Sequence, residues 1–441
     1  MSEQPAPPVE ERLRQLLHYL GIDKAHFAGR VPEDWVGLAT RFPEVLSSLT
    51  VIGGFDPRTV EHLATRLLTV IGDRGRNAEA VLAAMPRLPD AELVTLRDYE
   101  IFAWSDLATD RTEELVTAML QFLASMSSPA DQGRASLAEG SGEFDGISYR
   151  IRGTGPPLVL LPMFLAPSQW EPLVALLSEK YCTITLSGTA LGAVAILESR
   201  GHAVGYLQMV RTLLEEAQLC PGDAVLEVGC GTGVLLRWLA RRTAGAHCVT
   251  GIDINPYLLR EATALARQEG LQGSIEFREG NGKALPFPDA SFDVVISVTV
   301  IEEVDADRMV AEMVRVTKPG GRVALAARAV DRPYLVNLPL SAALKAKLEA
   351  PRGGVAPQGC GDASLYGRMQ RAGLAQLKML PQLTAFTRTH AAVVQHMEGQ
   401  LLINPSPDEA REWREARGRA EAEGTFFMAW PHHSAVGTKA R

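Results

Sequence analysis

The sequence predicts an α/β protein built on mostly parallel sheets, and three observations support this prediction. From residue 221 onward, short apolar segments alternate with segments of helical periodicity, as in a parallel sheet covered by helices. One apolar segment runs into a glycine-rich turn at 229–233. A stretch rich in Ser, Gly and Pro over 127–146 has the composition of a linker. We therefore expect two domains, 1–190 and 191–441.

Length and composition indicate an ordinary globular protein. The chain has 441 residues, 46% of them hydrophobic and 22% charged, and a formal net charge of −8, so a basic nucleic-acid-binding face is not expected. The five cysteines lie far apart, which argues against a zinc site or a disulfide framework. Neither a signal peptide nor an apolar run of the roughly 20 residues that span a membrane is present. We expect a cytoplasmic protein without nucleic-acid or membrane partners.

The elements of the second domain follow from its apolar periodicity. A helix is predicted over 206–219, where apolar residues recur at helical spacing. Further helices are predicted over 233–242, 257–268 and 306–316. Strands are predicted over 224–228, 247–252, 274–278, 292–298 and 322–327, with a turn at 318–321. Segments at 377–379, 426–430 and 435–438 are expected to add strands, the last of them antiparallel.

The glycine turn is the main candidate for a ligand site. Residues 225–233 read Val-Leu-Glu-Val-Gly-Cys-Gly-Thr-Gly. The nicotinamide fingerprint G-x-G-x-x-G/A is not matched, because Val234 stands at its last position. The G-K-[ST] of a P-loop is also absent. Glycines allow the backbone to approach a ligand and to adopt positive φ. Asp253 ends the next strand, where its carboxylate can accept both hydroxyls of a ribose, cap the following helix, or do both.

These residues resemble the first motif of the class I S-adenosylmethionine (SAM)-dependent methyltransferases. That motif, acid-x-G-x-G-x-G, is matched by Glu227, Gly229, Gly231 and Gly233. The resemblance implies SAM as the cofactor and a Rossmann-like sheet whose last strand is antiparallel. It also implies that Cys230, Asp253 and Ile254 belong to the cofactor site.

Residues 279–287 resemble a second motif of the UbiE-like, small-molecule branch of this family, roughly G-D-A-x-x-L-P-F. The family's acid accepts a hydrogen bond from the adenine amino group, but here Asn281 takes its place, with an uncharged amide oxygen. The resemblance assigns Gly282, Lys283, Ala284 and, on the fourth strand, Ser297 to the cofactor site. It covers about residues 205–330.

Methyl transfer mainly requires a nucleophile held in line with the methyl group, and a general base adds to the rate. The candidate bases are Glu302 and Glu303, whose alternative role is a solvated helix start. His432 and His433 either face a substrate pocket or lie in a surface turn. Segments 330–339 and 390–402 are expected to cover the site. Metal-ligand spacing is absent.

We interpret the chain as a SAM-dependent methyltransferase that acts on a small organic molecule. The alternative is a binding or scaffold protein in which the SAM fold accompanies an inactive partner-recognition domain. Self-association into a homo-oligomer is left open. The atom that receives the methyl group, on O, N, S or C, is not given by the sequence.

The first domain resembles the α/β-hydrolases, without their catalytic residues. Residues 16–29 resemble the helix and strand that lead to the nucleophile elbow, G-x-S-x-G, but Val31 stands where the serine should be. Strands are expected over 49–53 and 67–73. The acid of the triad falls at about Gly75, and the histidine falls near Ile101. An active esterase is therefore not expected.

After the linker, residues 147–155, 157–164 and 181–187 resemble the first strands of a hydrolase, which normally precede the elbow. The halves are thus in exchanged order. We hypothesise that residues 1–190 form one circularly permuted, catalytically inactive sheet. The alternative is two generic α/β fragments that pack separately.

Overall fold

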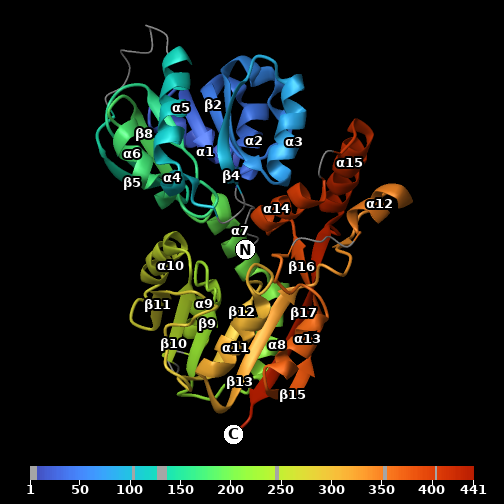
Figure 1. Cartoon of the computed structure of the whole chain (residues 1–441). Helices are drawn as coiled ribbons and strands as arrows, with labels where there is room; N and C mark the ends of the chain where they lie inside the picture. Colours follow the sequence, from blue (N-terminus) through green and yellow to red (C-terminus); the bar gives the residue numbers. More distant parts are fainter. Residues whose placement is uncertain (1–6, 102–104, 127–136, 244–247, 351–354, 403–404) are drawn as a thin grey trace. The chain divides into compact units, whose positions relative to one another are not determined.

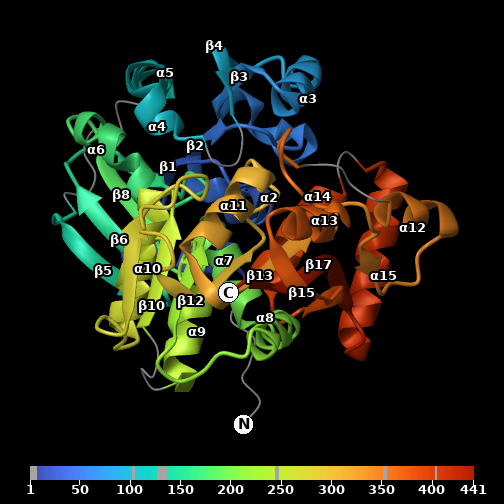
Figure 2. The same ribbon diagram turned by 60° about the horizontal axis from the view of Figure 1, so that its bottom comes forward.

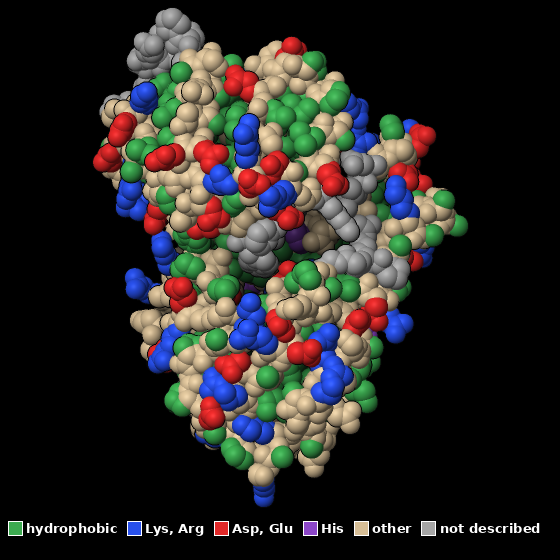
Figure 3. All heavy atoms as spheres, in the orientation of Figure 1, with side chains coloured by type: hydrophobic (Ala, Val, Ile, Leu, Met, Phe, Trp, Pro, Cys, Tyr) green, Lys and Arg blue, Asp and Glu red, His purple; other side chains and the backbone are tan. Residues whose placement is uncertain are grey.

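The computed structural model describes residues 7–101, 105–126, 137–243, 248–350, 355–402 and 405–441. The chain divides into two compact units, Met1–Ile196 and Leu197–Arg441, and each has its own sheet (Figure 1). Residues 127–136 of the expected linker lie outside the described residues. Among the described helices, none combines the length and apolar character needed to cross a membrane. On the face drawn in Figure 3, acidic and basic side chains are interspersed.

The N-terminal unit has one sheet to which both sides of the linker contribute. Strand β1 (Ala25–Gly29) pairs in parallel with β7 (Pro157–Leu160), so the alternative of two separate fragments is wrong. The strand order is β4-β3-β2-β1-β7-β8-β6-β5. The other strands are β2 (Leu46–Ile52), β3 (Leu67–Arg74), β4 (Glu92–Glu100), β5 (Gly140–Phe144), β6 (Ile147–Arg152) and β8 (Cys182–Ser187).

Strand β5 shows that the predicted linker is too long, because its residues lie inside 127–146. It is the edge strand and pairs only with β6 among the described strands, in antiparallel fashion. Its residues are largely exposed, so they carry no apolar alternation for a sequence pattern to detect. The linker that the sequence suggests is therefore shorter than predicted.

Helices cover both faces of this sheet. One core includes residues of α1 (Val9–Tyr19) and α2 (Pro32–Arg41). A second core lies under α5 (Thr112–Met126) and α6 (Glu171–Leu177), with the short α4 (Leu107–Asp110) beside them. Helix α3 (Arg76–Ala84) follows β3.

The C-terminal unit is built on a nine-stranded sheet (Figures 1 and 2). The central order is β11-β10-β9-β12-β13-β17-β14, and β15 and β16 also pair with β17. Strands β9 to β13 are parallel, whereas β17 is antiparallel to β13. The bounds are β9 (Ala224–Val228), β10 (Cys248–Asp253), β11 (Ile275–Glu279), β12 (Phe292–Val298), β13 (Thr317–Arg328), β14 (Leu335–Val336), β15 (Leu374–Met379), β16 (Gln382–Thr387) and β17 (Phe427–Lys439).

Two helical layers enclose this sheet. Helices α8 (Val204–Glu216), α9 (Val234–Thr243) and α10 (Pro256–Gln268) contribute to one core, together with α14 (Ala391–Leu401) and α15 (Pro407–Glu423). Helices α11 (Ala306–Val316) and α13 (Ser364–Arg371) contribute to the core on the opposite face. Residues 197–202 of α7 (Gly192–His202) and helix α12 (Ala342–Leu348) complete the unit.

Two sequence predictions in this unit need correction. The turn at 318–321 lies within the bounds of β13 as a bulge, because Phe292 pairs with Thr317 but Val294 already pairs with Arg322. The strands predicted at 426–430 and 435–438 are one strand, β17. The alternation of apolar and polar residues along β17 is hidden because its residues from Met428 to Gly437 are buried on both faces.

Candidate functional site

The glycine turn lies between β9 and α9, at the carboxyl edge of the sheet. Gly229, Gly231 and Gly233 have φ angles of 74°, 53° and 72°, in the region that favours glycine. The backbone amides of Gly229 and Cys230 both donate to the carbonyl of Ile252, at 2.8 and 2.9 Å. These backbone hydrogen bonds hold the turn against β10 without the help of any side chain.

Two of the glycines are also required by close approach. A Cβ atom on Gly229 would lie 2.3 Å from a methyl carbon of Val300, and one on Gly233 would lie 2.6 Å from the ring of Phe277. Both distances are shorter than any ordinary carbon contact. A side chain at either position would push the turn out of place, so both conformation and space select glycine.

Glu227 is a buried carboxylate at the end of β9. Only 4% of the residue is exposed, and its Oε2 atom has no hydrogen-bond partner among the residues that the structure describes. Burial raises the pKa of Glu227 well above its usual range, and the charge of Asp253 adds to this effect. A buried carboxylate without a partner is costly. An incoming ammonium group would remove this cost.

Asp253 supports the turn from the end of β10. One carboxylate oxygen accepts from the amide of Gly231 at 2.8 Å, and the other accepts from the amide of Asn255 at 2.9 Å. Burial raises the pKa of Asp253, and these backbone hydrogen bonds oppose the rise. Since a carboxylate offers about four acceptor positions, these backbone contacts leave acceptor capacity for a ligand.

The residues after Asp253 begin α10. The side chain of Asn255, and not that of Asp253, caps this helix by accepting from the amides of Tyr257 and Leu258. Between them, Ile254 is 65% exposed. This exposed apolar side chain directly follows Asp253 and offers a surface for a flat apolar group.

The second predicted segment, 281–284, forms a tight turn. The side-chain oxygen of Asn281 accepts from the amide of Lys283 at 2.9 Å, and its carbonyl oxygen accepts from the amide of Ala284 at the same distance. A second lone pair remains on the amide oxygen. Gly282 packs near Val228, where an added Cβ atom would lie 3.2 Å from a methyl carbon.

Ser297 lies on β12 and is almost completely buried. Its hydroxyl donates to the carbonyl of Val228 at 2.7 Å. The hydroxyl proton therefore ties β12 to β9 just below the glycine turn, and only the oxygen remains free to accept.

A buried ionic network behind the turn escaped the sequence analysis. Glu198, on α7, accepts from the hydroxyl of Thr232 at 2.6 Å and from Arg237 at 2.6 Å through both carboxylate oxygens. Arg237 is 1% exposed and also pairs with Glu269. The network fastens α7 to the middle of the turn. No motif marks Glu198 in the sequence, because its role depends on a contact between distant segments.

Glu302 and Glu303 do not start a helix, because α11 begins at Ala306 with Asp305 as its cap. Glu302 is fully buried, and its carboxylate accepts from the backbone amide of Arg328. Burial raises the pKa of Glu302, and the charge of Arg328 opposes the rise. Glu303 is partly exposed and pairs with the Arg328 guanidinium at 2.9 Å.

The prediction of a surface turn at His432 and His433 is wrong, because both residues lie within β17 and are buried. His433 is bonded at both ring nitrogens, to the hydroxyl of Tyr366 at 3.1 Å and to Asp331 at 2.8 Å. His432 bonds through Nδ1 to the hydroxyl of Thr384 at 3.2 Å. Its Nε2 atom has no partner among the described residues.

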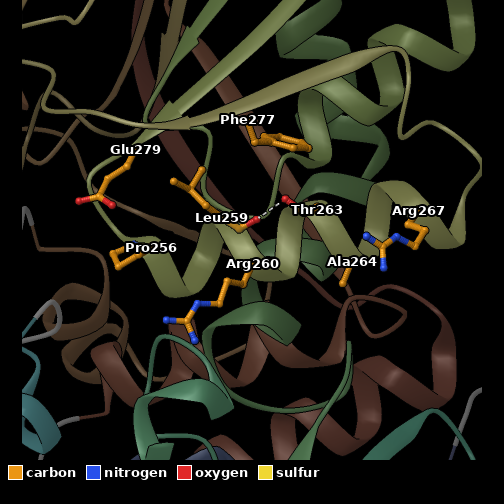
Figure 4. Close-up of a pocket in the computed structure, with 8 residues that line it drawn as sticks. All are labelled: Pro256, Leu259, Arg260, Thr263, Ala264, Arg267, Phe277 and Glu279. Carbon is orange, nitrogen blue, oxygen red and sulfur yellow. Dashed lines mark hydrogen bonds between the residues drawn. The ribbon is translucent and has the colours of Figure 1, made fainter. Parts of the chain in front are cut away.

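A cavity of about 450 Å³ lies beside this region, between α10 and the edge strand β11 (Figure 4). Phe277 and Glu279 come from β11. The other lining residues, Pro256, Leu259, Arg260, Thr263, Ala264 and Arg267, come from α10. None of the residues predicted to bind the cofactor lines this cavity. We place the candidate site at the carboxyl edge instead, because the buried carboxylates lie there. Within the described residues, no cluster of His, Cys, Asp and Glu is arranged to hold a metal ion.

Comparison with known proteins identifies relatives of part of the C-terminal unit. Residues 226–325 match the family described as "Methyltransferase domain". Among curated relatives, the chain is 37% identical over 120 residues to methyltransferase GfsG of Streptomyces halstedii, covering 27% of this chain and 42% of that protein. It is 36% identical over 114 residues to the ubiquinone/menaquinone biosynthesis C-methyltransferase UbiE of Shewanella halifaxensis, covering 26% and 45%.

A third relative is the sterol 24-C-methyltransferase ERG6B of Gibberella zeae, 41% identical over 102 residues, covering 23% of this chain and 26% of that protein. The chain spans less than half the length of these curated relatives. Residues 226–325 of the C-terminal unit are therefore similar to methyltransferase domains.

Proposed function

We propose that this protein transfers a methyl group from SAM to a small organic acceptor. The observation that carries the proposal is Glu227, a buried carboxylate with an unpartnered oxygen beside a glycine turn. The amino-acid part of SAM bears an ammonium group that can donate a hydrogen bond to this oxygen. The methyltransferase match over residues 226–325 and the small-molecule relatives support the same reading.

In this proposal the turn and two strand ends hold the cofactor. Glu227 and the backbone of Gly229, Cys230 and Gly231 bind the amino-acid part. Asp253 binds the ribose hydroxyls with its remaining acceptor positions. SAM supplies the methyl group on a positively charged sulfur, which is a good leaving group.

The adenine ring would lie between Ile254 and the turn at 281–284. Ile254 is exposed and can cover one face of the ring. The amide oxygen of Asn281 keeps one lone pair for the adenine amino group. Because this contact carries no charge, we expect it to contribute less than the acid found in the family. Gly282, Lys283 and Ala284 complete this turn, and Ser297 supports the glycine turn from β12 through its hydrogen bond to Val228.

The segment after β12 offers two acids, Glu302 and Glu303, as one source of a general base. Glu303 is the better candidate of the two acids there, because it is partly exposed, whereas Glu302 is fully buried. Replacing each by Gln tests this role. An unchanged kcat in both variants would show that neither acid accepts a proton.

Calorimetry with SAM and S-adenosylhomocysteine tests the proposed function. We expect both to bind the full chain, and Asp253→Ala to weaken SAM binding by about tenfold or more, since charge-assisted hydrogen bonds contribute about 1.5–3 kcal/mol. Absence of binding by the unaltered chain would favour the scaffold alternative. Unchanged affinity in Asp253→Ala would remove the ribose assignment. Labelled SAM offered with a metabolite mixture then identifies the acceptor.

For the N-terminal unit we propose a circularly permuted, inactive relative of the α/β-hydrolases. The parallel pairing of β1 with β7 supports the permutation, because it joins the segments before and after the linker. The positions of the triad hold Val31, Gly75 and Ile101, none of which can act as nucleophile, acid or base. Val31 and Ile101 are buried, and Gly53 lies between the side chains of Ile101 and Arg30.

A protease site inserted within 127–136 tests the shared sheet. After cleavage, we expect the two fragments to elute together under native conditions, because the ladder between β1 and β7 holds them. Separation of folded fragments would contradict the single sheet.

A further inference from the structure

His432 lies at the same sheet edge as the proposed cofactor site. In the antiparallel pairing of β13 with β17, His432 is opposite Arg328, the last residue of β13. The carboxyl ends of parallel strands lie at one edge of a sheet, so His432 shares this edge with Glu227 and Asp253. The side chain is 2% exposed.

The partners of His432 determine which ring nitrogen carries the proton. The hydroxyl of Thr384 lies 3.2 Å from Nδ1 and donates to the sulfur of Met209 at 3.8 Å. Since a thioether can only accept, the contact with Met209 favours the arrangement in which the Thr384 proton points to sulfur and its oxygen accepts from Nδ1–H. Nε2 is then the unprotonated nitrogen, and it has no partner among the described residues.

Arg200 supplies the complementary group. Its Nη1 donates to the hydroxyl of Thr299 at 2.9 Å, directly after β12, and its guanidinium stacks on Tyr206 at 5.2 Å. Its Nε–H is buried and has no partner in the described part of the chain. Arg200 is close enough to Glu227 and to His432 for its charge to lower the pKa of both.

Burial is the main cause that lowers the pKa of His432, to about 3, and Arg200 and Arg328 lower it further. The imidazole is therefore neutral at physiological pH and keeps a lone pair on Nε2. The buried acceptor on His432 and the buried donor on Arg200 thus both lack a hydrogen-bond partner among the described residues.

We propose that His432 and Arg200 together bind the hydroxyl group that receives the methyl group. This inference rests on the proposed function and names its substrate class. A hydroxyl donates to Nε2 of His432, accepts from Nε–H of Arg200 and keeps a second lone pair for the methyl carbon. An amine has a single lone pair and cannot both accept from Arg200 and attack. A nucleophilic carbon atom makes neither of these two contacts itself.

The chemical step balances with these residues alone. The hydroxyl oxygen forms a bond to the methyl carbon while the carbon–sulfur bond breaks, and its electron pair stays on sulfur as S-adenosylhomocysteine. The hydroxyl proton passes to Nε2 of His432. A methylated oxygen that still holds its proton is a far stronger acid than imidazolium, so even a weakly basic histidine accepts it and later releases it to water. In this arrangement Glu302 and Glu303 neutralise Arg328 and are not needed as bases.

The test uses phenol and anisole as probes, which differ in whether the oxygen carries a proton. Calorimetry measures their binding to the full chain saturated with S-adenosylhomocysteine. We expect phenol to bind about tenfold more tightly than anisole, the effect of one buried hydrogen bond.

His432→Leu should abolish this preference, and His432→Gln should retain part of it, because its amide oxygen can accept. His433→Gln is the matched control and should leave the preference intact, since His433 is bonded at both nitrogens. Equal binding of the two probes to the unaltered chain, or a preference that survives His432→Leu, would overturn the proposal.

A second measurement covers the case in which His432→Leu fails to fold. Nitrogen-15 NMR of histidine-labelled chain should show His432, identified by the signal missing in His432→Gln, protonated at Nδ1 and unprotonated at Nε2. The opposite tautomer would overturn the proposal. Failure of S-adenosylhomocysteine to bind at all would instead refute the proposed function, so the two failures are distinguishable.

Discussion

The turn after β9 and the turn after β1 have the same architecture but opposite chemistry. Each connects a parallel strand to a helix at the carboxyl edge of a sheet. After β9, the backbone carries glycines at positive φ, and the buried Glu227 and the partly buried Asp253 lie beside it. After β1, Gly29 is followed by Arg30 and then Val31, which is 3% exposed. The same fold element can therefore serve as a site or as a plain connection, and a few side chains decide which.

The energetic difference between the two turns is equally clear. Val31 gains stability from burial, as any apolar side chain does. Glu227 loses stability from burial, because its carboxylate is removed from water without a full set of partners. The burial of the Glu227 carboxylate at a cost in stability therefore indicates a binding site. This contrast can be tested in both units.

The largest effect is expected from Gly229→Ala. The new Cβ atom would lie 2.3 Å from Val300, and the φ angle of 74° adds about 1–2 kcal/mol of strain. We expect loss of SAM binding and a clear fall in the free energy of unfolding, measured by calorimetry and urea denaturation.

Gly270→Ala is the matched control, because Gly270 has a φ angle of 72° and nothing within 4 Å of the added atom. It should show the conformational strain alone, with SAM affinity unchanged. Equal effects of the two variants would mean that the close approach at Gly229 has no importance.

Glu227→Gln should separate binding from stability. The amide keeps the shape but removes the charge, so SAM affinity should fall by about 10- to 100-fold, as for a lost charge-assisted hydrogen bond. The free energy of unfolding of the ligand-free chain should rise at neutral pH. Because burial raises the pKa of Glu227, the native state binds this proton more tightly than the unfolded state. Its contribution to stability is therefore lost as pH increases from the usual carboxyl range towards the raised pKa.

Urea denaturation across pH checks this sign. The unaltered chain should lose stability relative to Glu227→Gln as pH rises. The reverse trend would show that the carboxylate is satisfied in the free protein.

The smallest effect is expected from Val31→Ser in the N-terminal unit. Restoring the hydroxyl should produce no hydrolysis of p-nitrophenyl acetate above background, because Gly75 and Ile101 supply neither acid nor base. Stability should fall by about 1–3 kcal/mol from a buried hydroxyl without a designed partner. Val31→Ala controls for the lost methyl groups, and measurable turnover in Val31→Ser would show that more of the hydrolase site survives than we propose.

The sequence was informative where function depends on consecutive residues. The glycine turn, Asp253 and the strands from β9 to β12 could all be predicted, because apolar periodicity and glycine spacing are local signals. Glu198 and its contact with Thr232 could not be predicted, since the two residues lie 34 positions apart. The long strand β17 was divided in two by the polar residues His432 and His433, which a buried strand does not usually carry.

The two adjacent histidines of β17 impose a constraint on how this protein can change. His432 shares its face of the strand with Thr384 and Met209, whereas His433 contacts Tyr366 on the opposite face. Because side chains alternate along a strand, a shift of β17 by one position in its pairing with β13 and β16 would exchange the two environments. Length changes within β17 are therefore tolerated less than point substitutions, although this strand lies outside residues 226–325, which match the methyltransferase family.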